Sequence, residues 1–216
     1  MRLTLAEKYK RVIALLNSEN PNAETELQYR NPYELLVAVI LSAQCTDKRI
    51  NAVTPQLFNR FPSPEDLARA DEEEIYSFIK SVSYPKAKSH NLSLMAKRLV
   101  EVYNSKVPSD TAELETLAGV GRKTANVIAS VVFKQAKMPV DTHVHRVSAR
   151  IGLTKNAKNV LQTEQQLMKN LKGYDIALIH HQLILHGRYV CKARRPLCEV
   201  CPLQSLCSFF QNQIKK

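Results

Sequence analysis

Glycine is scarce in this chain, and no apolar run is long enough to cross a membrane. Only 5 of the 216 residues are glycine, which argues against a glycine-rich all-β design and against low-complexity linkers. The longest charge-free apolar run, residues 35–45, is too short for a membrane-spanning helix, which needs about 20 residues. The N-terminus also lacks the apolar stretch and the small-residue cleavage site of a signal peptide. We therefore expect a soluble protein of the cytoplasm.

Acidic residues are the minority among the charged side chains. Asp and Glu total 20 against 31 Lys and Arg, which gives a formal charge of +11, and 44% of the residues are apolar. This apolar content permits a packed core, and the positive charge favours a polyanionic partner, either nucleic acid or an anionic membrane surface. Residues 80–100 hold five basic and no acidic residues, and residues 116–163 hold eight basic residues and one acidic residue, Asp141. We expect both stretches to contribute to a phosphate-contacting surface; a solvated helix face is the alternative for either one alone.

Helical periodicity runs through nearly the whole chain, and no segment shows a sustained alternation of apolar and polar residues. Asn31, Pro32 and Glu34 have the residue types of a helix N-terminus, and Asp110 and Glu113 repeat that pattern. The sequence therefore predicts an all-α protein. Beyond the helices opened by these two caps, the predicted helices cover residues 4–17, 46–60, 71–81, 86–104, 122–135, 142–151, 159–171 and 174–190.

Two of the few glycines stand close together in residues 117–121, Leu-Ala-Gly-Val-Gly, between two predicted helices. Glycine permits positive φ and close backbone approach, so such a turn can direct several N–H groups towards one point. The next helix starts near Arg122 and adds its own unpaired N-terminal N–H groups and its positive dipole end. The pattern is typical of a helix-hairpin-helix that binds a DNA phosphate without reading sequence. A tight turn that needs glycine for packing alone is the alternative interpretation.

Four of the five cysteines cluster near the C-terminus, with the spacing Cys191-x6-Cys198-x2-Cys201-x5-Cys207. In a reducing cytosol such a cluster indicates metal binding rather than disulfides. Four thiolates can hold either a tetrahedral zinc ion or a [4Fe-4S] cluster. Structural zinc sites usually have two closely spaced pairs, and here only one pair has the short spacing, so the pattern favours the iron–sulfur cluster.

Lys123 and Asp141 are the residues that could carry chemistry. Lys123 is the second residue of the helix after the hairpin, where neighbouring cations and the helix dipole disfavour a further positive charge and so favour a nucleophilic amine. Asp141 is the one carboxylate of its basic stretch and could stabilise a developing cation on a sugar. The alternatives are a solvated first-turn lysine and a helix N-cap aspartate. A helix of roughly 20 Å after Lys123 and an extended return of about 17 Å would let the two side chains meet.

On these motifs the sequence resembles the endonuclease III family, bacterial DNA glycosylases and abasic-site lyases of the helix-hairpin-helix superfamily. The resemblance is carried by residues 41–47 (Leu-Ser-Ala-Gln-Cys-Thr-Asp), 117–127 around the hairpin, 140–147 around Asp141, and 185–191 with the cysteine tail. It covers nearly the whole chain. The family implies base-excision repair: removal of oxidised pyrimidines from double-stranded DNA, with the damaged base flipped out, and cleavage of the abasic site by Schiff-base β-elimination.

The same resemblance implies a two-domain helix-hairpin-helix glycosylase fold with a C-terminal [4Fe-4S] cluster loop. Residues 25–135 would form a six-helix barrel that carries the hairpin, and residues 1–24 and 136–216 would form a discontinuous helical domain that holds the cluster. Double-stranded DNA with a damaged base or an abasic site would bind a monomer of the protein, in the cytoplasm and associated with the nucleoid.

By the resemblance, Lys123 is the nucleophile that attacks C1′ of the flipped nucleotide, and Asp141 assists departure of the base and activation of the lysine. Gln44 fills the vacated position in the base stack, Tyr84 matches the wedge that opens the duplex, and Asp47 lies near the pocket. The implied hairpin contacts to DNA are Gly119, Val120, Gly121 and Arg122, and the implied cluster ligands are Cys191, Cys198, Cys201 and Cys207.

The sequence departs from the family pattern at three places. Ala118 stands where the hairpin usually has proline, Cys45 where a small residue is usual, and residues 82–85, Val-Ser-Tyr-Pro, differ from the usual Gly-Leu-Tyr type of wedge loop. We expect a slightly looser turn and an ordinary packed thiol at Cys45. An adenine-mismatch glycosylase is the first alternative, although it usually lacks the lysine after the hairpin and carries an extra C-terminal domain. A DNA-binding protein without catalysis is the second.

Overall fold

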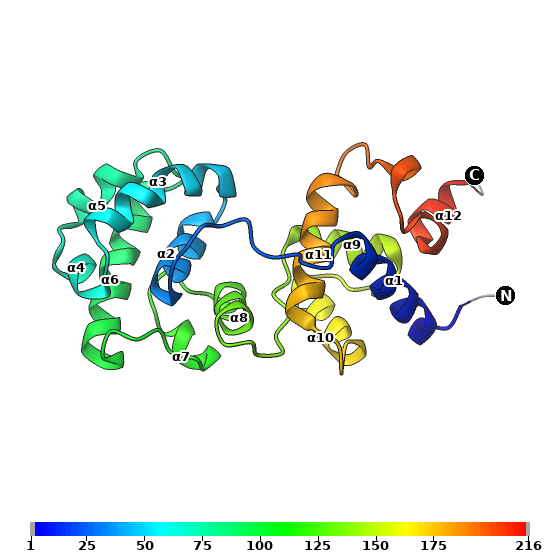
Figure 1. Cartoon of the computed structure of the whole chain (residues 1–216), viewed down its shortest axis with the longest axis horizontal. Helices are drawn as coiled ribbons and strands as arrows, with labels where there is room; N and C mark the ends of the chain where they lie inside the picture. The colour runs from blue at the N-terminus through cyan, green and yellow to red at the C-terminus, as the bar shows by residue number, and fades with distance from the viewer. Residues whose placement is uncertain (1–2, 215–216) are drawn as a thin grey trace. The chain divides into compact units, whose positions relative to one another are not determined.

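A computed structural model describes residues 3–214 of the chain, which divide into two compact units (Figure 1). One unit is formed by residues 25–135, and the other by the residues up to 24 together with those from 136 onwards. All regular secondary structure in the described residues is helical, which confirms the all-α prediction. None of the helices between residues 3 and 214 is long and apolar enough to span a membrane.

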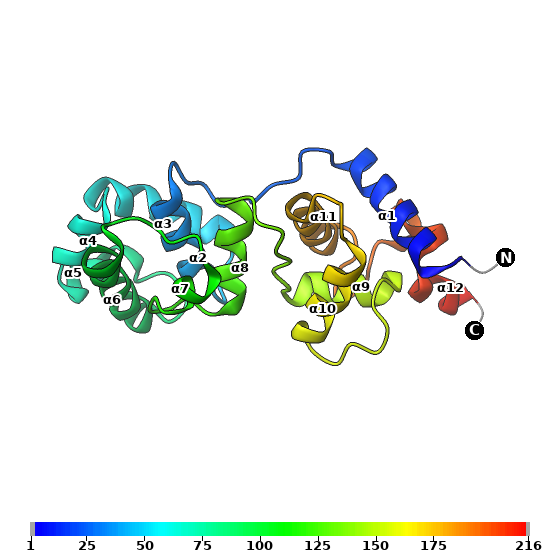
Figure 2. The ribbon, with the colours of Figure 1, turned by 90° about the horizontal axis from the view of Figure 1, so that it is seen from below.

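The unit of residues 25–135 is built around helix α2 (Pro32–Ser42). Its other helices are α3 (Asp47–Arg60), α4 (Pro64–Arg69), α5 (Glu72–Ile79), α6 (Pro85–Tyr103), α7 (Thr111–Glu115) and α8 (Arg122–Val131). Residues 33–41 are all buried, because apolar side chains cover nearly the whole circumference of α2, and such a helix is stable only when other elements surround it. Helices α3, α6 and α8 pack against it (Figures 1 and 2).

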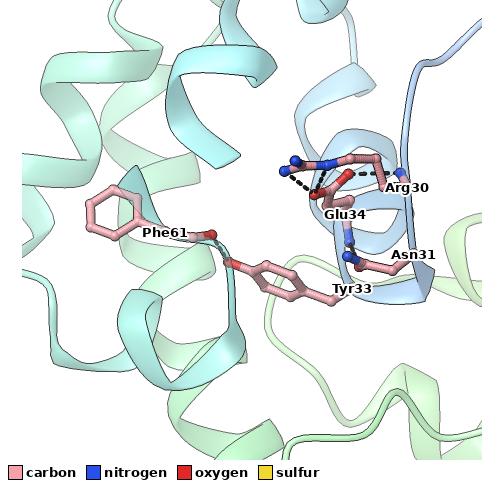
Figure 3. A network of polar contacts seen from close by, with 5 residues as sticks. All are labelled: Arg30, Asn31, Tyr33, Glu34 and Phe61. Carbon is pink, nitrogen blue, oxygen red and sulfur yellow. Dashed lines mark hydrogen bonds and ion pairs between the residues drawn. The ribbon is translucent and has the colours of Figure 1, made fainter. Parts of the chain in front are cut away.

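A polar network defines the start of α2 (Figure 3). Asn31 Oδ1 accepts the backbone N–H of Glu34 (2.9 Å), as predicted for an N-cap. The buried Glu34 carboxylate accepts the backbone N–H of Arg30 (2.7 Å) and pairs with its guanidinium (2.6 Å). The hydroxyl of Tyr33 donates to the carbonyl of Phe61, the C-cap of α3 (3.2 Å). The buried carboxylate and the buried hydroxyl therefore both have hydrogen-bond partners, as burial of polar groups requires.

The second unit joins the N-terminal helix to the C-terminal third of the chain. It contains α1 (Leu5–Glu19), α9 (Thr142–Ile151), α10 (Val160–Asn170), α11 (Ile176–Tyr189) and α12 (Ser208–Ile214), with short 3-10 helices at Cys198–Val200 and Gln204–Leu206. Helix α11 packs against α1 and α9, and α12 packs against α9. The buried hydroxyl of Tyr9 donates to the carbonyl of Leu153 (2.9 Å), so α1 shares a core with residues far along the chain.

The observed helices agree with the predicted boundaries within a few residues, with three exceptions. Helix α8 ends at Val131 rather than at residue 135, because Lys134 takes a left-handed conformation (φ 53°) and the N–H of Gln135 turns back to the carbonyl of Ala129 (3.0 Å). Helices α4 and α12 were not predicted. Both have fewer than eight residues, and helices this short depend on tertiary packing rather than on intrinsic propensity.

Candidate functional site

The turn of the predicted helix-hairpin-helix joins α7 to α8 and packs onto the core of its unit. Gly119 has a φ of +79°, and a Cβ atom there would lie 3.1 Å from Ile40 Cγ2 and 3.2 Å from Asn91 Cβ. Glycine therefore permits both the conformation and the close approach. The Val120 side chain is buried, and the N–H of Val120 donates to the carbonyl of Leu117 (3.1 Å). The predicted DNA contact at Val120 therefore has neither an exposed side chain nor an uncommitted N–H to use.

The N-terminus of α8 follows directly from this turn. Gly121 is the N-cap, and a Cβ atom there would meet nothing within 4 Å. The first helical hydrogen bond runs from the N–H of Ala125 to the carbonyl of Gly121 (3.0 Å), so the N–H groups of the first turn have no acceptor within the helix. Arg122 and Lys123 are both exposed at this end. The helix end thus combines N–H donors, the positive dipole end and two cations, a combination that suits a phosphate.

Two further loops of this unit carry the predicted contacts Gln44 and Tyr84. Gln44 follows α2, Tyr84 is the N-cap of α6, and both are exposed, Tyr84 by 65%. Both residues have left-handed backbones, with φ of 55° and 54°. The hydroxyl of Ser83 donates to the carbonyl of Gln44 (2.6 Å), so the two loops lie side by side. An exposed aromatic ring is suited to stacking on a base.

Cys45 and Asp47 belong to the same turn between α2 and α3 as Gln44. Asp47 is the first residue of α3, after the N-cap Thr46, and is half-buried. Cys45 is half-buried and packs against the apolar core of the unit, as expected for an ordinary packed thiol. The turn therefore carries an exposed amide side chain, a packed thiol and a half-buried carboxylate within four residues.

Asp141, the predicted catalytic carboxylate, lies in the other unit as the N-cap of α9. Its Oδ1 accepts the N–H of Val144 (2.8 Å), and its backbone carbonyl accepts the N–H of His145 (3.0 Å). The capping role that the sequence suggested for Asp141 is therefore present. Because Lys123 belongs to the unit of residues 25–135, the predicted meeting of the two side chains stays a prediction.

The four C-terminal cysteines line one pocket, whose walls are completed by apolar side chains such as Ile151, Leu203 and Phe209. Within residues 3–214, no three His, Cys, Asp or Glu side chains are arranged around a single metal ion; the four cysteines instead share the lining of this pocket. Burial raises the pKa of the thiols of Cys198 and Cys201, and neighbouring thiolates raise it further. Four thiolates therefore need compensating positive charge, which iron supplies, and this donor set fits a [4Fe-4S] cluster.

Two arginines of α9 hold the chain around the first of these cysteines. Arg146 donates to the carbonyls of Gly187 (2.8 Å) and Cys191 (3.1 Å), and Arg150 donates to the carbonyl of Lys192 (2.7 Å). We expected both arginines on a phosphate-contacting surface, but their guanidinium groups bond to the backbone of the cysteine segment. Their four-residue spacing, which puts them on one face of α9, is the signal in the sequence that could have indicated a shared partner.

Lys88 is another polar side chain whose place the sequence did not reveal. We expected its basic stretch at the surface, but Lys88 is only 6% exposed, and its Nζ donates to the carbonyls of Leu41 (2.8 Å) and Ala43 (2.7 Å). Its four-residue spacing from the buried Leu92 puts it on the inner face of α6. That spacing is the signal that could have identified it as buried.

Comparison with known families defines the class of protein. Residues 37–173 match the family model of the HhH-GPD superfamily of base excision DNA repair proteins, and residues 191–207 match the iron-sulfur binding domain of endonuclease III. The chain therefore belongs to the HhH-GPD superfamily of base excision DNA repair proteins.

Within that superfamily, the chain is 47% identical over 196 residues to endonuclease III of Bacillus subtilis strain 168, covering 91% of this chain and 90% of the relative. It is 39% identical over 198 residues to endonuclease III of Escherichia coli strain K12, covering 92% and 93%. A solved structure of a trapped endonuclease III–DNA covalent intermediate matches with a TM-score of 0.92 at 41% identity, over 99% of this chain and 100% of that one. The family within the superfamily is thus that of endonuclease III.

Membership of this family confirms the predicted fold, activity and cofactor. The chain is a base-excision-repair DNA glycosylase with abasic-site lyase activity, and it binds DNA. Its four-cysteine segment carries a [4Fe-4S] cluster. The four cysteines that line the pocket would hold the cluster.

The two glycines of the hairpin should respond differently to the same substitution. Gly119→Ala places a side chain at positive φ and against Ile40 and Asn91, so we expect the free energy of unfolding to fall by about 1–3 kcal/mol. A Cβ atom at residue 121 would meet nothing within 4 Å, so Gly121→Ala should change the free energy of unfolding by no more than about 0.5 kcal/mol. Urea denaturation of the cluster-containing protein measures both, and equal stability of the two variants would contradict the described packing.

The cysteine segment should account for all bound iron. We expect the purified protein to be yellow-brown, with broad visible absorbance, and Cys201→Ser to lose most of that absorbance and its iron. Cys45→Ser is the matched control and should keep both, because Cys45 packs in the other unit. Iron analysis and visible spectroscopy measure this; a colourless wild-type protein with stoichiometric zinc would overturn the cluster assignment.

Proposed function

We propose that Lys123 and Asp141 carry the glycosylase and lyase chemistry of this chain, and that its substrates are oxidised pyrimidines and abasic sites in duplex DNA bound by a monomer. The single observation that carries the proposal is the position of Lys123, exposed in the first turn of the helix that follows the Gly119–Gly121 turn. A phosphate held at that helix end would bring a nucleotide's sugar towards the lysine amine. The related endonuclease III that was trapped as a covalent intermediate with DNA supports a covalent mechanism.

The proposed reaction begins when the uncharged Lys123 amine attacks C1′ of the flipped nucleotide. The bond from C1′ to the base breaks, and the base leaves with the bonding electron pair and takes up a proton. A proton then moves from the nitrogen to O4′ as the C1′–O4′ bond breaks, which leaves a Schiff base between Nζ and C1′. Loss of a C2′ proton and departure of the 3′ phosphate cut the strand, and water finally releases the lysine.

Asp141 is proposed to act at the first step. Its carboxylate would accept the proton of the Lys123 ammonium before the attack, and the resulting carboxylic acid would supply the proton that the departing base takes up. One of its oxygens, Oδ1, caps α9, and an ionised carboxylate has further acceptor capacity on its second oxygen. Structural and catalytic roles are therefore compatible in one side chain.

The loops at Gln44 and Tyr84 are proposed to replace the base that has been flipped out. The Gln44 amide would occupy the vacated position in the stack, and the Tyr84 ring, which is 65% exposed, would stack on the unpaired strand. Asp47 would lie at the edge of the pocket, and the first turn of α8 with Arg122 would hold the phosphate. These proposed contacts are to the DNA backbone and to stacked bases rather than to base edges. Such contacts suit an enzyme that must act on a lesion in any DNA sequence.

Lys123→Ala should abolish the covalent adduct that borohydride traps on abasic-site DNA and lower lyase activity by several orders of magnitude, because the nucleophile is gone. Gel electrophoresis of the trapped complex measures this. Lys106→Ala, an exposed lysine outside the proposed interface, is the control and should form the adduct normally. A Lys123→Ala protein that still forms the adduct and cleaves abasic sites would contradict the proposal.

Asp141→Asn separates capping from catalysis, because asparagine caps a helix as well as aspartate but carries no charge. We expect the variant to fold with an unchanged midpoint of unfolding and to excise thymine glycol from a duplex about 100-fold more slowly or worse. Asp175→Asn, which removes the charge from the N-cap of α11, should excise normally. Undiminished excision by Asp141→Asn would leave that residue with the capping role alone.

A further inference from the structure

Lys88 is a buried lysine that the proposed chemistry does not use. It lies in the second turn of α6, and its ammonium donates to the carbonyl of Leu41, within α2, and to that of Ala43, the C-cap of α2. Burial lowers the pKa of the Lys88 ammonium, which is the cost of placing a charge there. A buried charge is tolerated when it is hydrogen-bonded, and here two of its three N–H donors have carbonyl partners.

The two carbonyls are at the end of a helix, where acceptors lack partners. The last carbonyls of α2 have no N–H to bind within the helix and carry its partial negative charge. Residues 33–41 are buried and the bond from Lys88 to the carbonyl of Leu41 is buried as well, so that carbonyl is remote from bulk water and needs a donor from another element. Lys88 supplies that donor, and in doing so it sets the direction in which the chain leaves α2 towards Gln44.

A further hydrogen bond joins the turn after α2 to the start of α6. Ser83 donates its hydroxyl to the carbonyl of Gln44 (2.6 Å), and Ser83 directly precedes Tyr84, the N-cap of α6. Gln44 and Tyr84 both have positive φ, a conformation that costs energy in residues other than glycine and persists where the surroundings impose it. Ser83 thus binds the backbone of Gln44, and Lys88 binds that of Ala43 directly before it.

Helix α6 also supports the hairpin. Asn91, less than one turn after Lys88, contacts Gly119 so closely that a Cβ atom at Gly119 would lie 3.2 Å from Asn91 Cβ. The first two turns of α6 therefore contact the turn after α2, carry the Tyr84 loop and pack against the hairpin. These are the three segments proposed to meet DNA.

We propose that Lys88 is a positioning residue for base extrusion, which it serves by holding the turn after α2 so that Gln44 enters the vacated stack beside Tyr84. The proposal rests on the roles proposed above for Gln44 and Tyr84, and it assigns Ser83 a supporting part through the Gln44 carbonyl. Lys88 itself touches neither the sugar nor Lys123 in this role. Its loss should therefore impair the reaction where a base stack must be opened and filled, and spare the reaction where there is no stack.

The experiment compares borohydride trapping on an abasic site in duplex DNA with trapping on the same oligonucleotide as a single strand. Lys88→Met removes the ammonium and keeps an unbranched side chain of similar length. We expect the ratio of duplex to single-strand trapping rates to fall by about tenfold or more, since misplacing a contributing group by about 1 Å can cost up to about 100-fold. Lys106→Met, the same substitution at an exposed lysine just after α6, should keep the wild-type ratio.

A second variant keeps the test decisive if Lys88→Met does not fold. Ser83 is half-buried, and Ser83→Ala removes only the hydrogen bond to the Gln44 carbonyl. This variant should also lower the ratio of duplex to single-strand trapping rates. A loss of trapping that is equal on both substrates, or an unchanged ratio in a folded Lys88→Met protein, would overturn the proposal. Where Lys88→Met does not fold, an unchanged ratio in Ser83→Ala overturns it.

Failure of this proposal is distinguishable from failure of the proposed function. If Lys123 is not the nucleophile, Lys123→Ala forms the adduct on both substrates, whatever Lys88 does. If Lys123 is the nucleophile and Lys88 has no positioning role, Lys123→Ala loses the adduct on both substrates while Lys88→Met keeps the wild-type ratio.

Discussion

Helix α2 is apolar on nearly every side, and the requirement that it be buried all round organises the unit around it. Neighbouring helices cover its side chains, but the polar ends of a buried helix need partners of their own. Asn31 and Glu34 provide them at the start, and Lys88 provides them at the end. Helix α6, which carries Lys88, follows directly after its N-cap Tyr84 and contacts Gly119 through Asn91. The bonds from Lys88 to the end of α2 therefore bring the segments proposed to contact DNA together on one helix.

The positive charge of the chain serves two purposes that composition does not separate. Arg122 and Lys123 are exposed at the N-terminus of α8, where a cation adds to the attraction for phosphate. Lys88, Arg146 and Arg150 instead donate to backbone carbonyls within their own units. Part of the excess of basic residues is therefore structural, since these side chains bind the protein's own backbone.

Much of the fold could be predicted because the deciding interactions are local. The caps Asn31, Asp110 and Asp141 bind N–H groups only a few residues ahead, so residue type and spacing were sufficient. The short helices α4 and α12 could not be predicted, since tertiary contacts rather than propensity stabilise them. Of the candidate site, the hairpin and the shared cysteine cavity followed from spacing. The catalytic roles proposed for Lys123 and Asp141 come from the family resemblance, because they depend on a bound nucleotide rather than on neighbouring residues.

The sequence by itself determined where most of the helices begin, where the hairpin needs glycine, and which four thiols line one pocket, because each of these depends on residues that are close together in the chain. Only the tertiary structure decided which basic side chains face solvent and which bond inside. Lysine and arginine have long apolar stems with charged ends, so their residue type suits either place. The carbonyls that bind Lys88 lie 45 and 47 residues away, and they come within reach only when α2 and α6 pack together.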